Sequence, residues 1–162
     1  MIRNLGELGP NLQKIMTRLM SNQNLLKLLF YTEKDPLSKI DLTQEQIENE
    51  VYEKLIKIVP RVGPKETAKS LISLRATRGT LNSENNEFRN ILLNIEVFVP
   101  LTQWFIKDKN LRPFAIMGEI QNSLSGKRIN GLGTITGGDF SINFLTEEIS
   151  CYEMTFSIIE YD

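Results

Sequence analysis

The sequence predicts an α+β fold, in which N-terminal helices precede a largely antiparallel sheet with one helix packed between strands. Two observations carry this prediction. Apolar residues recur at helical spacing in the first third of the chain, and they alternate with polar residues in most of the remainder. The 162 residues fit a single domain, 1–162, with a helical N-terminal region at 1–64 and a sheet-plus-helix core at 65–162.

Two helices are expected before residue 35. The first begins near Gly9-Pro10 and carries an apolar stripe that extends back to Leu8 and comprises Leu12, Ile15, Met16, Leu19 and Met20. Ser21-Asn22 interrupts this stripe, and residues 25–30 form a second, short and strongly apolar helix. Asp35-Pro36 ends the pattern, because the residue before a proline avoids helical backbone angles.

A third helix has the clearest start signal. Thr43 and Gln46 form a capping box, in which each side chain satisfies a backbone N–H of the other residue. The predicted helix then places four apolar residues on one face: Ile47, Val51, Leu55 and Ile58. Acidic residues crowd its early turns and basic residues its late turns, as the helix dipole favours. Pro60 and Gly63-Pro64 are expected to end it.

Period-two alternation begins after Pro64 and predicts two strands. Residues 72–77 form the first strand, and the polar stretch from Gly79 to Asn86 is expected to be a long hairpin loop. The second strand has the clearest alternation in the chain, and Pro100 stops it. Its alternating apolar residues are Ile91, Leu93, Ile95, Val97 and Val99.

A connector from Trp104 to Asn110 leads to the one helix of the sheet region. Arg112-Pro113 opens this helix, since proline fits the first helical position. Its inner face comprises Ile116, Met117, Ile120 and Leu124, and Gly126 is the expected C-terminal cap.

Three further strands complete the predicted sheet as a meander. Residues 127–136 are strand-like, and Gly137-Gly138 is expected to form a two-residue hairpin turn. An alternating strand with Phe140, Ile142 and Phe144 follows, and a turn near Glu147-Glu148 leads to the last strand. There Tyr152, Met154, Phe156 and Ile158 share one face, and Cys151 falls on the polar face as an incidental free thiol.

The composition excludes several classes of function. With no histidine and one cysteine, the chain cannot form a Ser-His-Asp triad, a Cys-His pair, a His-bearing zinc site or an internal disulfide. We therefore expect synthesis in a reducing cytoplasm. We also expect no membrane partner, because no targeting segment or membrane-length apolar run is present.

The remaining motifs favour structure over chemistry. The glycines from Gly131 to Gly138 lie between predicted strands and not at the start of a helix, so no helix N-terminus would face a phosphate. Turns and close backbone packing therefore explain these glycines better than nucleotide binding. The carboxylates Glu96 and Glu153 lie on polar strand faces without an apolar pocket that would raise a pKa. We expect no catalytic, cofactor-binding or metal-binding residues and no cofactor, although an acid–base carboxylate pair stays an alternative.

Charge is distributed unevenly along the chain. Residues 54–111 carry ten basic and five acidic side chains, whereas residues 112–162 carry three basic and seven acidic ones. The basic candidates are Arg75, Arg78, Arg89, Lys107 and Lys109. Three interpretations stay open for them: a weak nucleic-acid patch, the solvated face of two strands, or half of an electrostatic interface with the acidic segment.

Residues 110–120 (NLRPFAIMGEI) and 124–133 (LSGKRINGLG) give the chain a family resemblance. Together with the order of strand, helix, Gly-rich strand, hairpin and terminal strand, they resemble the tail terminator, or tail-completion, neck proteins of long-tailed bacteriophages. The resemblance covers about residues 70–162. It implies a small α+β subunit, without catalytic residues, that assembles as a ring, commonly a hexamer, and is part of the virion tail or neck. The helical N-terminal region is a departure from the family pattern.

The resemblance also implies a function and a set of partners. Such a ring caps the finished tail tube, stops tail assembly and joins the tail to the head connector. The implied partners are further copies of the chain, the tail tube protein, the head connector or stopper protein, and the sheath protein as an additional candidate. No sequence-specific nucleic acid is expected. A head-completion (stopper) or other tail-associated neck protein is the alternative in this class. A small carboxylate-dependent enzyme and a nucleic-acid-binding packaging factor are alternatives of other classes.

The uneven charge suggests how copies could meet in a ring. A head-to-tail contact joins two different surfaces of neighbouring copies. Repeated contacts of this kind form a closed ring when the rotation from copy to copy is a whole-number fraction of a full turn. We therefore expect an interface in which basic residues of one copy approach acidic residues of the next. The basic side comprises Arg75, Arg78 and Arg89, with Lys107 and Lys109 as further candidates, and the acidic side comprises Glu147, Glu148 and Glu153.

Overall fold

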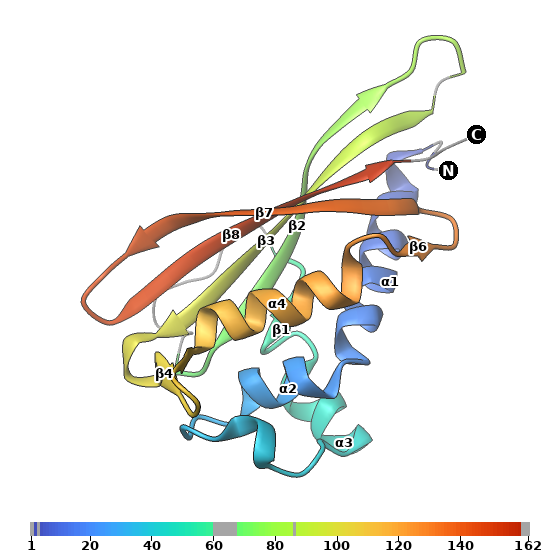
Figure 1. The fold of residues 1–162 in the computed structure, drawn as a ribbon. Helices are drawn as coiled ribbons and strands as arrows, with labels where there is room; N and C mark the ends of the chain where they lie inside the picture. The colour runs from blue at the N-terminus through green and yellow to red at the C-terminus, as the bar shows by residue number, and fades with distance from the viewer. Residues whose placement is uncertain (1, 3, 60–67, 86, 160–162) are drawn as a thin grey trace.

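A six-stranded sheet forms one layer of the protein, and helices cover one of its faces (Figure 1). The computed structural model describes residue 2 and residues 4–59, 68–85 and 87–159. The strand order is β1-β2-β3-β8-β7-β6, and only the β1–β2 pair is parallel. The predicted α+β class with a largely antiparallel sheet is confirmed.

The N-terminal helices lie where the apolar spacing places them. A short 3-10 turn, Leu5–Glu7, leads into α1 (Leu8–Met20), and α2 spans Gln23–Phe30. The two helices are separated because the Asn22 side chain accepts a hydrogen bond from the Leu25 N–H and caps α2. The buried faces of both helices belong to the single hydrophobic core of the described residues.

The third predicted helix is much shorter than expected. After a 3-10 turn at Pro36–Ser38, the capping box of Thr43 and Gln46 is present and starts α3 (Gln44–Gln46). A π-helical turn (Ile47–Val51) follows and ends the helix, so its predicted extension to Ile58 is wrong. Residues Ile56–Lys57 form strand β1, because burial of Ile56 beside Ile72 outweighs the helical pattern. The predicted stops at Pro60 and Gly63-Pro64 lie outside the described residues.

The central hairpin is longer than its apolar pattern indicates. Strands β2 (Leu71–Leu81) and β3 (Phe88–Pro100) pair antiparallel, with Ile72 opposite Val97. The predicted loop from Gly79 is wrong at its start, since two register shifts, around residues 77 and 79, let β2 continue to Leu81. The predicted stop of β3 at Pro100 is confirmed.

The predicted connector contains a small hairpin of its own. Strands β4 (Phe105–Ile106) and β5 (Asn110–Leu111) pair around Asp108 and Lys109, which both have positive φ. Helix α4 (Arg112–Leu124) then begins at Arg112-Pro113 as predicted, and its predicted inner face is buried. Gly126 has φ +71 directly after the capping residue, in agreement with its predicted role.

The last three strands are β6 (Arg128–Ile129), β7 (Gly133–Leu145) and β8 (Ile149–Ile159). The predicted hairpin turn at Gly137-Gly138 is wrong, because both glycines lie inside β7 at a register shift. The chain reverses earlier instead, around Gly131, between Ile129 and Gly133. The glycines supply the positive φ, 97° and 119°, that the bulge in β7 requires. The turn near Glu147-Glu148 is confirmed.

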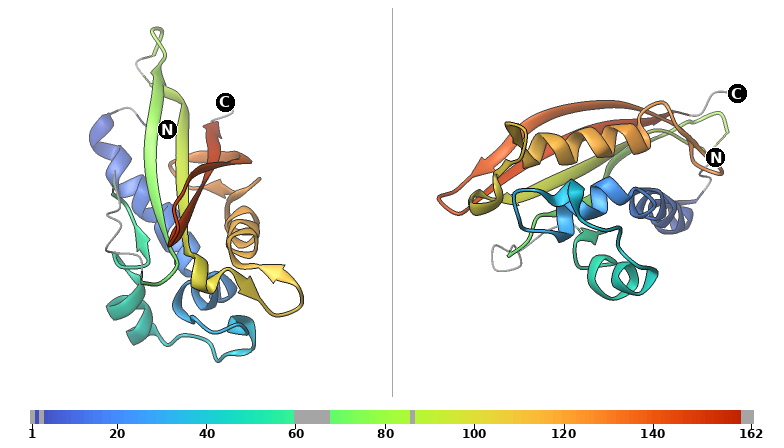
Figure 2. Two further views of the ribbon diagram at one scale, coloured as in Figure 1. Left: turned by 90° about the vertical axis from the view of Figure 1, so that its left-hand side faces the viewer. Right: turned by 60° about the horizontal axis from the view of Figure 1, so that its bottom comes forward.

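The two faces of the sheet differ in chemistry. The face toward α1, α2 and α4 carries apolar rows from β2, β3 and β8, such as Leu74, Ile95 and Met154 in one row. The opposite face, called here the polar face, carries Arg75, Glu96 and Glu153 in its central strands. The right-hand view of Figure 2 shows the β2–β3 hairpin and the β7–β8 turn at different ends of the sheet.

A buried arginine joins the N-terminal helices to α4. Arg112 is completely buried, and its guanidinium donates hydrogen bonds to four backbone carbonyls. These carbonyls belong to Leu28, Tyr31 and Glu33, at and after the end of α2, and to Gln103, at distances of 2.6–2.9 Å. Burial lowers the pKa of the Arg112 guanidinium, but an arginine with these acceptors stays charged.

Candidate assembly interface

Strand β7 presents a long open edge. On one side β7 pairs with β8 along most of its length, whereas β6 on the other side covers only Gly133 and Thr134. Ile135 exchanges backbone hydrogen bonds with Gly126 and Lys127, and the Gly137 carbonyl accepts one from the Ser125 hydroxyl. From residue 138 to residue 145, no described strand lies beside the outer edge.

The open part of β7 carries exposed apolar side chains on both faces of the sheet. Phe140 is 57% exposed, Ile142 54%, Phe144 42% and Leu145 60%. Phe140 and Ile142 lie on the helix-covered face, opposite Met154 and Tyr152. A register shift between Ile142 and Phe144 moves Phe144 to the polar face, where its ring lies 6.0 Å from that of Phe98. An exposed apolar edge of this length is a template for pairing with another strand.

An aromatic cluster supports the start of this edge. The rings of Phe114 on α4, Phe140 on β7 and Tyr152 on β8 contact one another at centroid distances of 5.4–6.2 Å. Trp104 adds a ring 6.3 Å from Tyr152. These contacts hold Phe140 in place while more than half of its surface stays exposed.

Strand β2 forms the second open edge of the sheet. Strand β1 pairs only with Ile72 and Ser73, and no described strand covers the outer side of β2 from Leu74 to Leu81. Beside this edge a groove of about 330 Å³ opens on the helix-covered face. Its lining is mostly apolar and comprises Ile2, Leu5, Leu8, Ala76, Thr77, Arg78, Gly79, Phe88 and Ile91.

The predicted interface residues Arg75 and Glu153 meet within one chain. The Arg75 guanidinium is 2.7 Å from a Glu96 carboxylate oxygen and 3.0 Å from one of Glu153. Asn143 on β7 also donates a hydrogen bond to Glu96, which is 6% exposed. Arg75 thus neutralises two carboxylates that face each other across β3 and β8. This arrangement corresponds to pairing between neighbouring strands of one sheet.

The other predicted interface residues lie in exposed turns and edges. Arg78 is exposed on β2, and Glu147 and Glu148 are exposed in the β7–β8 turn. Lys107 and Lys109 are exposed in the β4–β5 turn, where Lys107 contacts Asp35 at 3.3 Å. Arg89 lies on β3 opposite Thr80, and its side chain is outside the described part. Figure 1 shows the β2–β3 hairpin and the β7–β8 turn at opposite ends of the sheet.

The comparison with protein families covers most of the chain. A family profile described as YomW matches residues 22–158. The chain belongs to the YomW family. The family takes its name from a phage, which indicates a phage protein. The match begins within the helical N-terminal region and includes both open edges. None of the curated proteins that were compared matches this YomW-family chain.

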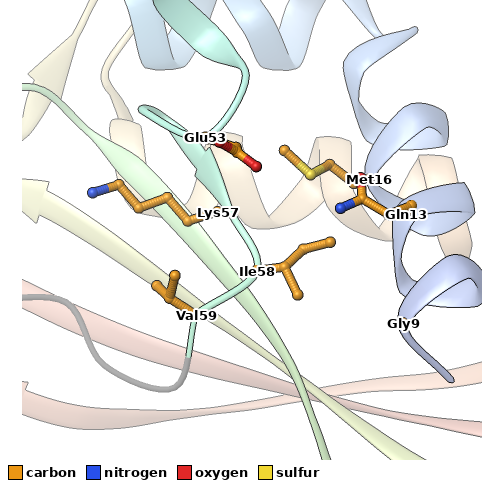
Figure 3. A pocket seen from close by; sticks show the side chains of 7 residues that line it. All are labelled: Gly9, Gln13, Met16, Glu53, Lys57, Ile58 and Val59. Carbon is orange, nitrogen blue, oxygen red and sulfur yellow. The ribbon is translucent and has the colours of Figure 1, made fainter. Parts of the chain in front are cut away.

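A separate pocket of about 400 Å³ lies between α1 and the β1 segment (Figure 3). Figure 3 shows the Glu53 carboxylate directed toward Gln13 and Met16 of α1, while the Lys57 ammonium points away from them. The remaining lining residues are Gly9, Ile58 and Val59. One carboxylate and one amide directed into the pocket do not make an acid–base pair. In the part of the chain that the structure describes, no group of three or more potential metal ligands occurs. None of the helices in this part has the length and apolar character of a membrane span.

The single cysteine of the YomW-family chain is more deeply placed than the alternation indicates. Cys151 lies on the polar face, as predicted, but it is completely buried between Phe98 and Phe144 of the neighbouring strands. Burial, aided by the negative charge of Glu96, raises the pKa of the Cys151 thiol to about 12. Cys151 is a free thiol, as predicted, and the alternation gave no sign of its complete burial.

This burial predicts a low thiol reactivity and a specific pH dependence. At pH 8 a thiol reagent should react fully with the unfolded chain and hardly at all with the folded protein, because only the thiolate is nucleophilic. Above pH 9 the unfolded chain loses the Cys151 proton while the folded protein keeps it up to about pH 12. Stability should therefore fall as pH rises through this range. Denaturant unfolding of the wild type and Cys151→Ala from pH 8 to 11 measures the effect. Equal slopes in both proteins would contradict it.

Sequence patterns did not identify the open edges as a site. The alternation of Phe140, Ile142 and Phe144 is typical of a strand with one face on the core, and it does not show that the strand lies at an edge. One available signal was Leu145 directly after Phe144, since two adjacent apolar residues cannot both face the same core.

Proposed function

We propose that the chain is a structural virion protein that forms a ring at the end of a phage tail tube. The ring ends tail assembly and joins the tail to the head connector, and it acts without catalysis. The observation that carries this proposal is the open edge of β7, where Phe140, Ile142, Phe144 and Leu145 are all 42–60% exposed. A strand edge of this kind is suited to contact with another protein chain.

The phage-derived family name and the resemblance of residues 70–162 to tail terminators support the same function. The sheet also has two different open edges, on β7 and on β2. Two different contact surfaces on one subunit permit head-to-tail assembly. Such an assembly forms a closed ring when a whole number of rotations between neighbouring subunits makes a full turn.

The partners in this function follow from the position of the ring. Further copies of the chain contact one another within the ring, the tail tube protein contacts one of its ends, and the head connector or stopper protein contacts the other. In a contractile tail the sheath protein is an additional partner. The protein is made in the host cytoplasm and becomes part of the virion.

Deletion of the gene from the phage that encodes it tests this function. We expect lysates with DNA-filled heads and with separate tails of uncontrolled length, seen by negative-stain electron microscopy. Supply of the wild-type gene in trans should restore joined particles of normal length. Tails of normal length that fail to join heads would replace the terminator assignment with a head-completion (stopper) function. Normal infectious particles would overturn both.

A further inference from the structure

We propose that the open edge of β7 in one copy pairs with the open edge of β2 in the next copy, so that the sheet continues from subunit to subunit. This inference rests on the self-assembly part of the proposed function and specifies the surfaces that meet. It commits to a second copy of this chain as the occupant of both edges.

The strand directions fit such a contact. Three antiparallel pairings, β2–β3, β3–β8 and β8–β7, make β7 run opposite to β2 within the sheet. A second copy placed beside β7 in the same orientation therefore presents its β2 antiparallel to β7. Antiparallel pairs form readily from separate chains, because each exchanges backbone hydrogen bonds directly with its neighbour.

The lengths of the two edges also match. The uncovered stretch runs from residue 138 to residue 145 in β7 and from residue 74 to residue 81 in β2. The two stretches are displaced from each other along the strand direction. Within one sheet, cross-strand pairs through β8 and β3 place Phe140 beside Leu74 and not beside Gly79. A contact that uses both stretches offsets neighbouring copies by about five residues, or roughly 17 Å along the strands. Such an offset inclines the strands to the ring axis, as in closed β-barrels.

Side chains on both faces complement each other when Gly79 lies opposite Phe140. On the helix-covered face, the exposed Phe140 ring then lies over the apolar groove that Gly79 and Ile91 line. An aromatic ring beside an edge glycine is a favourable cross-strand arrangement. On the polar face, the same register places Arg78 opposite Ser141 and diagonal to Asp139, which is within reach of a long side chain.

The charges that remain after internal pairing support this register. Arg75 and Glu153 are occupied with each other in the same chain, so they are not the principal interfacial pair. Arg78 and Asp139 are both exposed and lie on the polar face at the two open edges. The acidic Glu147 and Glu148 follow directly after the β7 edge and add negative charge at its far end. The edges therefore carry opposite charges.

Charge reversal at the two edges tests the pairing. We expect that Asp139→Arg and Arg78→Asp each weaken self-association at least about tenfold, because like charges then meet. An equimolar mixture of the two variants should associate to within about threefold of the wild type, since every edge then meets an edge of opposite charge. The double variant should behave like the mixture. Analytical ultracentrifugation over a concentration series gives the dissociation constants.

Two exposed positions away from both edges provide matched controls. Glu45→Arg on α3 and Lys34→Asp in the loop after α2 repeat the charge changes and should leave association unchanged. Far-UV circular dichroism shows whether each variant is folded, and rescue in the mixture is not expected from unfolded proteins. A monomeric wild type, wild-type association of the single variants, or failure of the mixture each overturns the edge pairing. Gene deletion decides the tail function separately, so the two proposals fail by different results.

Discussion

Replacement of Arg112 by methionine is expected to lower the free energy of unfolding by about 3–5 kcal/mol. Methionine retains the apolar stem but removes every donor, and four backbone carbonyls then lose their partners. Arg112 is completely buried, and no buried side-chain nitrogen or oxygen of the described residues lacks a hydrogen-bond partner. No buried side-chain donor of the described residues is therefore free to replace the guanidinium. Urea unfolding monitored by circular dichroism measures the loss.

Two variants show whether the hydrogen bonds cause this loss. Arg112→Lys keeps the charge but has fewer donors and a different geometry, so it should recover only part of the lost stability. Arg128→Met makes the same chemical change at an exposed position in β6 and should alter stability by less than about 0.5 kcal/mol. A loss below about 1 kcal/mol for Arg112→Met would mean that the four carbonyls find other donors.

Replacement of Gly137 by valine is expected to destabilise the protein by about 2–4 kcal/mol. Gly137 has φ +97, which side chains other than glycine adopt only with strain. A Cβ atom there would also lie 3.1 Å from the Thr155 carbonyl oxygen, and this backbone atom is held in the β7–β8 ladder. The substitution should therefore distort the bulge that directs the second half of β7.

Alanine at two glycines separates strain from side-chain size. Gly137→Ala should still destabilise the protein, by about 1–3 kcal/mol, because the backbone angle and the close contact persist. Gly118→Ala in α4 should stabilise it by about 0.5–1 kcal/mol, since no atom lies within 4 Å of the new Cβ and the backbone is helical. Thermal unfolding of the two variants in parallel compares them. Equal shifts in Tm of the same sign would contradict the strain at Gly137.

Local signals predicted the elements that depend on local physics. The Thr43 capping box, Pro113 at the start of α4 and the stop of β3 at Pro100 all depend on nearby backbone groups, and all three are present. The helix predicted over 43–58 failed because β1 forms only in the presence of β2, which follows more than ten residues later. The Gly137-Gly138 turn failed because a glycine pair permits a bulge as readily as a hairpin.

The candidate site shows the same division between local and tertiary information. Uneven charge suggested a contact between Arg75 of one copy and Glu153 of the next, but the sequence could not show that the two side chains meet within one chain, with β3 between their strands. The exposed apolar edge was missed because exposure depends on the place of β7 in the strand order. Arg112 was recognised only as the residue before a proline, since its four acceptors lie in segments up to 84 residues away.

The strand order also determines when the sheet can be completed during translation. Strand β8 lies between β3 and β7 although it follows both of them in the chain. A ribosome that has released residues 1–145 has therefore produced two strands whose shared neighbour has not yet been synthesised. Until Ile149–Ile159 emerges, β3 and β7 cannot join into one sheet, and their apolar side chains depend on chaperones or on rapid completion of the chain.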